Sequence, residues 1–257
     1  MSQSNASAST IGRPSRVAKI AFWLATLTLV AIVIGILGAM SGALPPFSGF
    51  LLFAAAMVLG SLLTLLVGLV GLVTTRARAG RPARPGRGQA LAAVGIGAAL
   101  LIVLAVLASR SGGVPAIHDI TTDPGDPPAF VAAQRAAQEQ GRKLDYPQGN
   151  PDTPALQKEA YPDLEPIGLE VPPAEALRRA HRVAEDLGWQ IAEVDDQQGR
   201  LEATSTSRLF HFVDDIVVRV RPAPSGSILD LRSTSRVGES DLGANASRVR
   251  KFLSKMS

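Results

Sequence analysis

The fold of the soluble part is decided by one stretch, LFHFVDDIVVRVRPAPSGSILDLRSTS, which occupies residues 209–235. Apolar and polar residues alternate on both sides of Pro222–Ser227, and this period of two is typical of a β-hairpin with one buried face. We expect strands over Leu209–Arg221 and Ile228–Ser235, in the register that makes one face apolar and the other charged. That register pairs Arg219 with Asp230, Val218 with Leu231, Val220 with Leu229, Ile216 with Ser233 and Val217 with Arg232.

The charged face of this hairpin brings acids and bases close together. We interpret them as a solvent-exposed ladder of ion pairs, because one face of an antiparallel hairpin usually meets water when the other forms a core. Each exposed pair would contribute about 0.2–1 kcal/mol. The ladder consists of Asp215, Arg219, Asp230 and Arg232.

One acid interrupts the apolar face. Asp214 shares its row with Ile216 and Val218, and the register places it opposite Ser235. A buried carboxylate needs hydrogen bonds or a charged partner, because burying it bare is very unfavourable. The sequence therefore predicts a polar cluster where the sheet meets the last helix. Its members are Asp214, Ser235, Arg236, Asp241 and Asn245.

Two readings of this cluster stay open. A helix N-terminus beside an arginine suits a small anion such as phosphate or carboxylate, which would make the cluster a ligand site. Alternatively, Asp241 caps the helix and Arg236 pairs with Asp214, which would make it a structural lock between helix and sheet.

Hydrophobic periodicity extends the hairpin into a soluble α+β domain over residues 171–257. Pro173–Leu187 is an amphipathic helix that Gly188 ends, and a shorter hairpin follows it. The domain is expected to have two layers, an antiparallel sheet of about four strands flanked by two helices. The other expected elements are strands Trp189–Val194 and Leu201–Thr206 and a last helix Leu242–Met256 with Asp241 as N-cap.

A proline-rich arm precedes this domain over residues 111–170. Ten prolines lie between positions 109 and 172, and each fixes its own φ and favours extended backbone before it. We expect a strap laid over the domain, not a strand-rich core, with Ile117, Ile120 and Phe130 tucked in. Short helices are expected at Pro128–Gln140 and near Pro154–Ala160.

The N-terminal part contains three uncharged apolar runs long enough to cross a bilayer. They cover about residues 20–40, 50–73 and 91–108, within a membrane region of 20–110. Gly60, Thr64 and Gly68 recur every fourth position, a spacing that lets helices approach closely. Because the runs carry no internal charge, we expect these helices to pack and not to form a proton or ion path.

The arginines predict the orientation of these helices. The loop 74–89 carries five arginines and no acid, whereas the loop 41–49 carries no charge, and the tail 1–19 is basic. The positive-inside rule then places the tail and the loop 74–89 in the cytoplasm and the C-terminal domain outside it. A cleaved signal peptide over residues 1–40 is the alternative, and it leaves the domain on the same side.

Composition argues against several classes of function. The net charge of +4 comes largely from basic flanks of apolar runs, so we expect no nucleic-acid partner, and the absence of cysteine excludes thiolate metal sites and disulfides. His118, His181 and His211 are far apart in sequence, and no phosphate-binding glycine loop is present, so neither a metal nor a cofactor is expected.

Several motifs resemble those of a known family, the domain of unknown function 1499 found in bacteria and plastids. They lie at Leu209–Arg219, Arg232–Asn245, Gly188–Trp189, Gly199–Ala203 and Ile117–Thr121, and the similarity covers about residues 115–257. Three preceding spans resemble a recurrent architecture of that family. The resemblance implies a cell-envelope context, here a bacterial inner membrane with a periplasmic domain, and no established activity. Many members carry a cysteine motif near the start of the domain; this chain has none.

Three functions are compatible with these features. The first is a non-enzymatic module of the envelope that binds another envelope protein or a small anionic ligand, with the lipid bilayer as its other partner. The second is an envelope hydrolase that uses Asp214 with Ser235 or Arg236. The third is a structural protein of membrane assembly.

Overall fold

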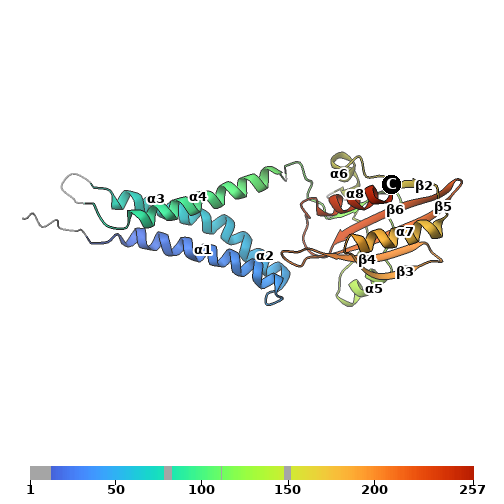
Figure 1. Ribbon diagram of the computed structural model, residues 1–257, viewed down its shortest axis with the longest axis horizontal. Coiled ribbons are helices and arrows are strands. Elements are labelled where there is room, and N and C mark those ends of the chain that lie inside the picture. The colour runs from blue at the N-terminus through green and yellow to red at the C-terminus, as the bar shows by residue number, and fades with distance from the viewer. Residues whose placement is uncertain (1–12, 78–82, 111, 148–151) are drawn as a thin grey trace, which may run out of the picture. The chain divides into compact units, whose positions relative to one another are not determined.

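The computed structural model describes residues 13–77, 83–110, 112–147 and 152–257 (Figure 1). The chain divides into two compact units, Met1–Arg110 and Ser111–Ser257. Most of the predicted basic tail and part of the basic loop, residues 1–12 and 78–82, lie outside the described residues.

The first unit is a bundle of apolar helices. Helix α1 (Arg16–Met40) is followed by a long second helix and by α4 (Arg87–Arg110). The second helix consists of α2 (Pro46–Ala55), a π-helical turn η1 (Ala56–Gly60) and α3 (Ser61–Thr75). In the part of the chain that the structure describes, three helices are long and apolar enough to cross a membrane. The predicted spans are therefore confirmed as helices, each extended by several residues at one or both ends.

Small residues bring these helices together, as the sequence predicts. A Cβ added to Gly60 would lie 2.8 Å from the side chain of Thr28, and one added to Gly68 would lie 2.9 Å from Val94. The hydroxyls of Thr28 and Thr64 are 3.2 Å apart. Close backbone approach and a hydroxyl pair are typical of helix packing in membranes.

The second unit contains a six-stranded antiparallel sheet in the order β1-β6-β5-β4-β3, with β2 also paired to β6. Four strands correspond to the predicted ones, and β1 and β2 are short additions from the proline-rich arm. The strands are β1 (Asp119–Thr121), β2 (Ile167–Leu169), β3 (Gln190–Asp195), β4 (Arg200–Thr206), β5 (Val213–Ala223) and β6 (Gly226–Ser235).

The register predicted for the long hairpin is confirmed at every pair. Arg219 lies opposite Asp230, Val217 opposite Arg232 and Asp214 opposite Ser235. The turn is shorter than expected, because β5 and β6 remain paired out to Ala223 and Gly226. Alternation alone fixed this pairing, since a shift by one residue would exchange the apolar and charged faces.

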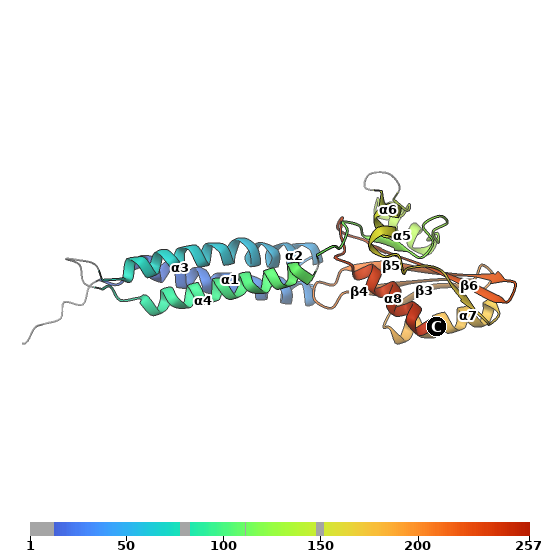
Figure 2. The ribbon, with the colours of Figure 1, turned by 90° about the horizontal axis from the view of Figure 1, so that it is seen from above.

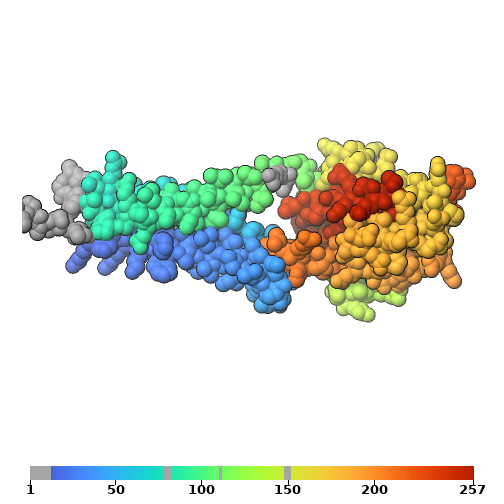
Figure 3. Space-filling model, viewed as in Figure 1, coloured from blue at the N-terminus to red at the C-terminus, as the bar shows by residue number. Residues whose placement is uncertain are grey.

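Two helices cover the apolar face of the sheet. Helices α7 (Pro173–Asp186) and α8 (Ala244–Met256) lie side by side on it (Figure 3). The core beneath them includes Leu177, Val218 and Leu231. Trp189 stacks on Phe252, with 5.1 Å between ring centroids.

The arm covers the opposite, charged face and is part of the same compact unit. Its helices α5 (Ala132–Glu139) and α6 (Thr153–Ala160) lie on the other side of the sheet from α7 and α8 (Figure 2). Gln157 of α6 holds β1 by accepting from the Thr121 amide at 3.0 Å and donating to its carbonyl at 2.6 Å. Ile117, Ile120 and Phe130 are buried, as the sequence predicts.

Helix α5 begins four residues later than the predicted Pro128, and Glu202 of β4 explains why. Its buried carboxylate accepts from the amides of Val131 and Ala132 at 2.7 and 3.0 Å, and from Ala133 at 2.9 Å. These amides have no intrahelical partner, and a carboxylate at a helix N-terminus also suits the helix dipole. A strand residue thus sets where the helix of the arm starts.

Replacing Glu202 by glutamine is expected to loosen α5 while the sheet remains folded. A neutral amide loses the charge and one acceptor oxygen, and loss of a cap costs about 0.5–2 kcal/mol. Hydrogen exchange should accelerate for the amides of residues 131–139 and remain unchanged in β5 and β6. Equal protection of 131–139 in both proteins would contradict this role. Glu175→Gln, at an exposed position on α7 on the other side of the sheet, is the control.

Candidate functional site

The predicted charge ladder is not exposed. The side chains of Asp215 and Asp230 are 0% exposed and that of Arg232 is 3% exposed, whereas Arg219 keeps some contact with solvent. The expectation of a solvated ladder is wrong because the arm lies over this face, with Phe130 and Leu144 packed against the strands. These charges are therefore an internal layer between arm and sheet.

Arg232 ties the two parts of this layer together. Its Nε and Nη2 donate to the two carboxylate oxygens of Asp119, at 2.9 and 2.7 Å. It also donates to the carbonyls of Pro128 and Leu144 in the arm. Its guanidinium carbon lies 4.9 Å from the centroid of the Phe130 ring. A bidentate ion pair, supported by a cation–π contact with an aromatic ring, fixes the Arg232 side chain in one position.

The buried acids of the hairpin are also paired. Asp230 accepts from Arg219 Nε at 2.9 Å and lies 2.8 Å from Arg221 Nη2. Asp215 accepts from Arg236, whose Nη2 is 2.7 Å from Oδ1. Because these carboxylates are removed from water, the small energies of exposed pairs do not apply to them.

The predicted polar cluster forms in part, around Asp214. Arg248 Nη2 donates to Asp214 at 2.5 Å, and Arg248 Nη1 donates to Ser233 at 3.0 Å. Asn245 accepts from Ser233 at 2.6 Å and donates to Ser235 at 2.9 Å. Asp214, Ser233 and Asn245 are buried. These groups satisfy one another across β5, β6 and α8, which is the arrangement of a structural lock.

The other two predicted members lie elsewhere. Arg236 turns to the arm side of the sheet, where it pairs with Asp215 and not with Asp214. Asp241 accepts from the amides of Gly243 and Asn245 at 2.8 and 2.7 Å. Helix α8 begins at Ala244, two residues later than predicted, and its N-cap residue is Gly243, which has a left-handed backbone. Asp241 therefore caps the helix from two residues before the N-cap position.

The hydrolase hypothesis required Asp214 to act with Ser235 or Arg236. In the structure Asp214 pairs with Arg248, and Arg236 belongs to the opposite face of the sheet. A general base must reach the group that it activates. Ser235 does lie opposite Asp214 in the sheet, whereas Arg236 does not reach it among the described residues, so hydrolysis by Asp214 and Ser235 stays a hypothesis.

Sequence reasoning missed two members of the lock, Ser233 and Arg248. Ser233 faces inward in the predicted register, and Arg248 follows Asn245 by three residues. Residues three apart lie on the same side of a helix. Placing Asn245 against the sheet was therefore enough to bring Arg248 to Asp214.

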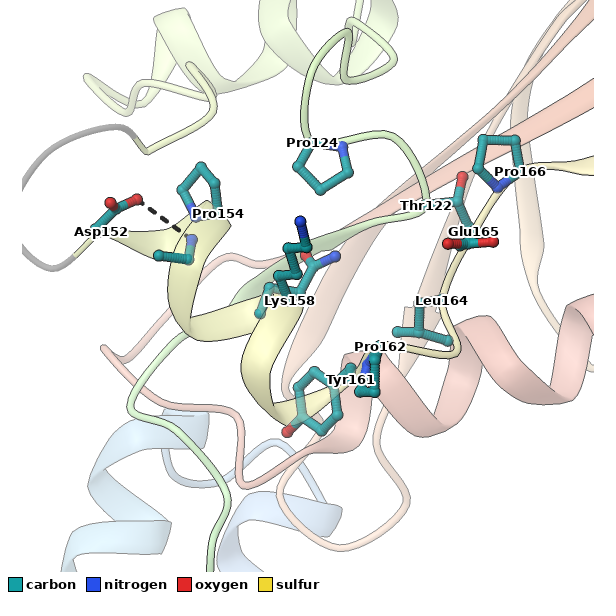
Figure 4. Close-up of a pocket in the computed structure, with 12 residues that line it drawn as sticks. Thr122, Pro124, Asp152, Pro154, Lys158, Tyr161, Pro162, Leu164, Glu165 and Pro166 are labelled. Carbon is teal, nitrogen blue, oxygen red and sulfur yellow. Dashed lines mark hydrogen bonds between the residues drawn. The ribbon is translucent and has the colours of Figure 1, made fainter.

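A cavity of about 760 Å³ lies beside α6 (Figure 4). Its charged residues are of mixed sign, with Lys158 among them pointing toward Pro124, and Asp152 and Glu165 opposing its charge. The Asp152 carboxylate is occupied, since it accepts from the Ala155 amide. Four prolines complete much of the wall: Pro124, Pro154, Pro162 and Pro166. The lining offers no group of like charges directed at one point.

A smaller cavity of about 290 Å³ has a different chemistry. It lies between the arm and the end of β6, and bases line it from both sides. Arg142 and Lys143 come from the arm, and Arg236 comes from the sheet. Two acids, Asp119 and Asp145, also border this cavity, and Asp119 is already paired with Arg232. Of the predicted cluster, Ser235 and Arg236 reach this pocket.

Two guanidinium groups keep unused donors here. Arg142 donates through Nε to Gln140, while its buried Nη2 has no hydrogen-bond partner among the described residues. Arg236 uses Nε and Nη2 on Asp215, which leaves Nη1. Buried donors are normally satisfied, so an unpaired one beside a cavity points to a missing acceptor. Phosphate and carboxylate oxygens are the acceptors that guanidinium groups bind best.

A third cavity, of about 410 Å³, shares Leu144 and Asp145 with this basic pocket. Tyr146 lines it, and its buried hydroxyl has no hydrogen-bond partner among the described residues. Burial raises the pKa of the Tyr146 hydroxyl far above its usual value, with a further contribution from the negative charge of Asp119, while Arg232 opposes the shift. The phenol therefore stays protonated at neutral pH.

Comparison with known proteins agrees with this architecture. Residues 119–256 match the family described as Protein of unknown function (DUF1499). The matched region contains the whole sheet and both of the helices that cover its apolar face. No similar sequence is found among curated proteins. With more than half of its length matched and three apolar helices before the match, the chain belongs to the DUF1499 family and is a member with candidate membrane spans.

Proposed function

We propose that this protein is a membrane-anchored module that binds a small anion outside the cytoplasm, in the envelope of a bacterial cell. The observation that carries the proposal is the basic pocket formed by Arg142, Lys143 and Arg236, in which a buried guanidinium nitrogen of Arg142 has no hydrogen-bond partner among the described residues. The pocket is built jointly by the arm and the sheet, so the tertiary fold brings together bases that are far apart in sequence.

The chemistry of the pocket favours an oxyanion. A phosphate or carboxylate can accept from Arg142 Nη2 and Arg236 Nη1 while Lys143 contributes a further positive charge. Asp215 orients Arg236, so binding an anion would not require that side chain to be reorganised. A volume of about 290 Å³ suits a small group and excludes a folded partner. We therefore favour ligand binding over hydrolysis.

The extracytoplasmic location rests on the distribution of charge. Five arginines lie in the loop 74–89 and none in the loop 41–49, and loops rich in Arg and Lys stay in the cytoplasm. A reporter enzyme that is active only outside the cytoplasm should therefore give signal when fused after residue 112 and none after residue 80. Signal from the second fusion alone would reverse the proposed orientation.

Binding of inorganic pyrophosphate to the full chain in lipid nanodiscs should depend on the pocket arginine. We expect Arg142→Gln to weaken binding roughly 10- to 100-fold, because a hydrogen bond to a charged group contributes about 1.5–3 kcal/mol. Isothermal titration at constant ionic strength measures this directly. Arg135→Gln is the matched control, since Arg135 lies on the same arm and pairs with Glu193 at the surface. Equal affinities for the three proteins, or no binding to any, would contradict the proposed site.

A further inference from the structure

One end of the sheet carries an unusual group of exposed apolar side chains. Leu209 is 54% exposed, Val237 48% and Leu242 67%. Among the described residues of the second unit these are the three most exposed large apolar side chains; Val194 follows at 37%. Isolated exposed apolar residues are ordinary, but a group gathered at one end of a domain marks an interaction surface.

The topology explains why they gather. Leu209 is in the loop 207–212 between β4 and β5, and the other two are in the loop 236–243 between β6 and α8. Thr206 pairs with Val213 and Asp214 with Ser235, so both loops leave the same end of the sheet. The opposite end, at the turn 195–200, is polar and includes Asp195 and Asp196.

Each of the two loops contains one residue with a strained, left-handed backbone conformation. His211 has a φ of 54° and Leu242 a φ of 53°, in the left-handed region that residues with a side chain rarely adopt. Such conformations persist only where the surrounding structure imposes them, and they occur often at functional sites. For Leu242 the strained residue is itself the most exposed of the three tips.

The chain also enters the second unit at this end. The amide of Ser235 donates to the carbonyl of His118, and that of Asp241 donates to the carbonyl of Ile117. Ile117 follows Arg110, the last residue of α4, by only seven positions, and α4 contains a candidate membrane span. A stretch of seven residues reaches at most roughly 25 Å. The covalent connection alone therefore keeps Ile117, at this end of the sheet, within roughly 25 Å of the end of α4.

We propose that the tips Leu209, Val237 and Leu242 form a lipid-contact surface that enters the interface of the bilayer in which the chain is anchored. Apolar side chains at the boundary between headgroups and acyl chains, with bases beside them, are the usual chemistry of interfacial binding. Arg208, which is exposed next to Leu209, supplies such a base. This surface requires no ligand in the basic pocket, and it could contact the bilayer whichever side of the membrane the second unit occupies. The lipid-contact proposal is therefore independent of the proposed function.

The absence of cysteine makes a direct test possible. Single substitutions Leu209→Cys, Val237→Cys and Leu242→Cys in the full chain give one thiol each for a fluorophore. The probe is a nanodisc of phosphatidylcholine and phosphatidylglycerol that contains lipids with a nitroxide quencher near the headgroup. Val194→Cys is the matched control, an exposed apolar residue at the polar end of the sheet. Fluorescence of Trp189 reports that each variant is folded, in a Trp23→Phe background.

Quenching at the three tips should exceed quenching at position 194 roughly threefold or more, since interfacial side chains lie about 5–10 Å deep, where the nitroxide is. Quenching at the tips equal to that at position 194, with free reaction toward a water-soluble maleimide, would overturn the proposal. Slow maleimide reaction without lipid quenching would overturn it as well, because a protein would then cover the tips. Three sites keep the test valid if one variant does not fold.

Discussion

Replacing Arg232 by methionine is expected to lower the free energy of unfolding of the second unit by about 3–5 kcal/mol. Methionine fills a similar volume, so the loss comes from Asp119, whose carboxylate would stay buried without its partner. The carbonyls of Pro128 and Leu144 lose a donor at the same time. Arm and sheet should separate more readily as a result.

Trp189 allows this to be measured in the full chain. It is buried against Phe252, and with Trp23→Phe in the background it is the only tryptophan, so its fluorescence follows urea unfolding of the second unit in detergent. Adding Asp119→Leu to Arg232→Met should recover part of the loss, because no buried charge then remains unpaired. A loss below about 1 kcal/mol in the single variant, the value for exposed pairs, would show that the arm does not cover this ion pair in solution.

The second large effect concerns the lock between the sheet and α8. Arg248→Met is expected to cost about 3 kcal/mol, because Asp214 would be left buried without its cation. Ser233 would also lose a donor. Asp214→Asn combined with Arg248→Met should be more stable than Arg248→Met alone, since the neutral amide removes the unpaired charge.

Arg250 on the same helix provides the control. Its pair with Asp163 is about half exposed on both sides, so Arg250→Met should cost only about 0.2–1 kcal/mol. Urea unfolding followed by Trp189 fluorescence compares the two variants in one background. Similar losses for Arg248→Met and Arg250→Met would contradict the assignment of Asp214, Ser233, Asn245 and Arg248 as a structural lock.

The sequence was sufficient for the hairpin because its information is local. Within the hairpin, Arg219, Val217 and Asp214 each have one partner that keeps the two faces distinct. The same reasoning placed an acid in the apolar row and required a polar cluster around it. Periodicity carries no information about distant segments, so it could not name Arg248 as the partner of Asp214.

The exposure of the charged face could not be predicted by the same means. Two charged faces look alike in sequence whether water or another segment covers them. The cover here is Phe130, Leu144 and α5, more than 60 residues before the hairpin. A strap with Phe130 tucked in was expected, but nothing in its prolines indicated which face it crosses. The basic pocket depends on that crossing, since Arg142 and Lys143 meet Arg236 only there.

The binding of an anion in this pocket is the central claim, and side-chain NMR of the full chain in detergent micelles tests it most directly. On titration with inorganic phosphate at constant ionic strength, the Nε–Hε signals of Arg142 and Arg236 and the amide of Ser235 should shift together in a saturable way. Those of Arg135 and Arg250 should stay in place. Shifts spread evenly over all arginines, or no saturable shift at Arg142, would contradict the proposed anion site.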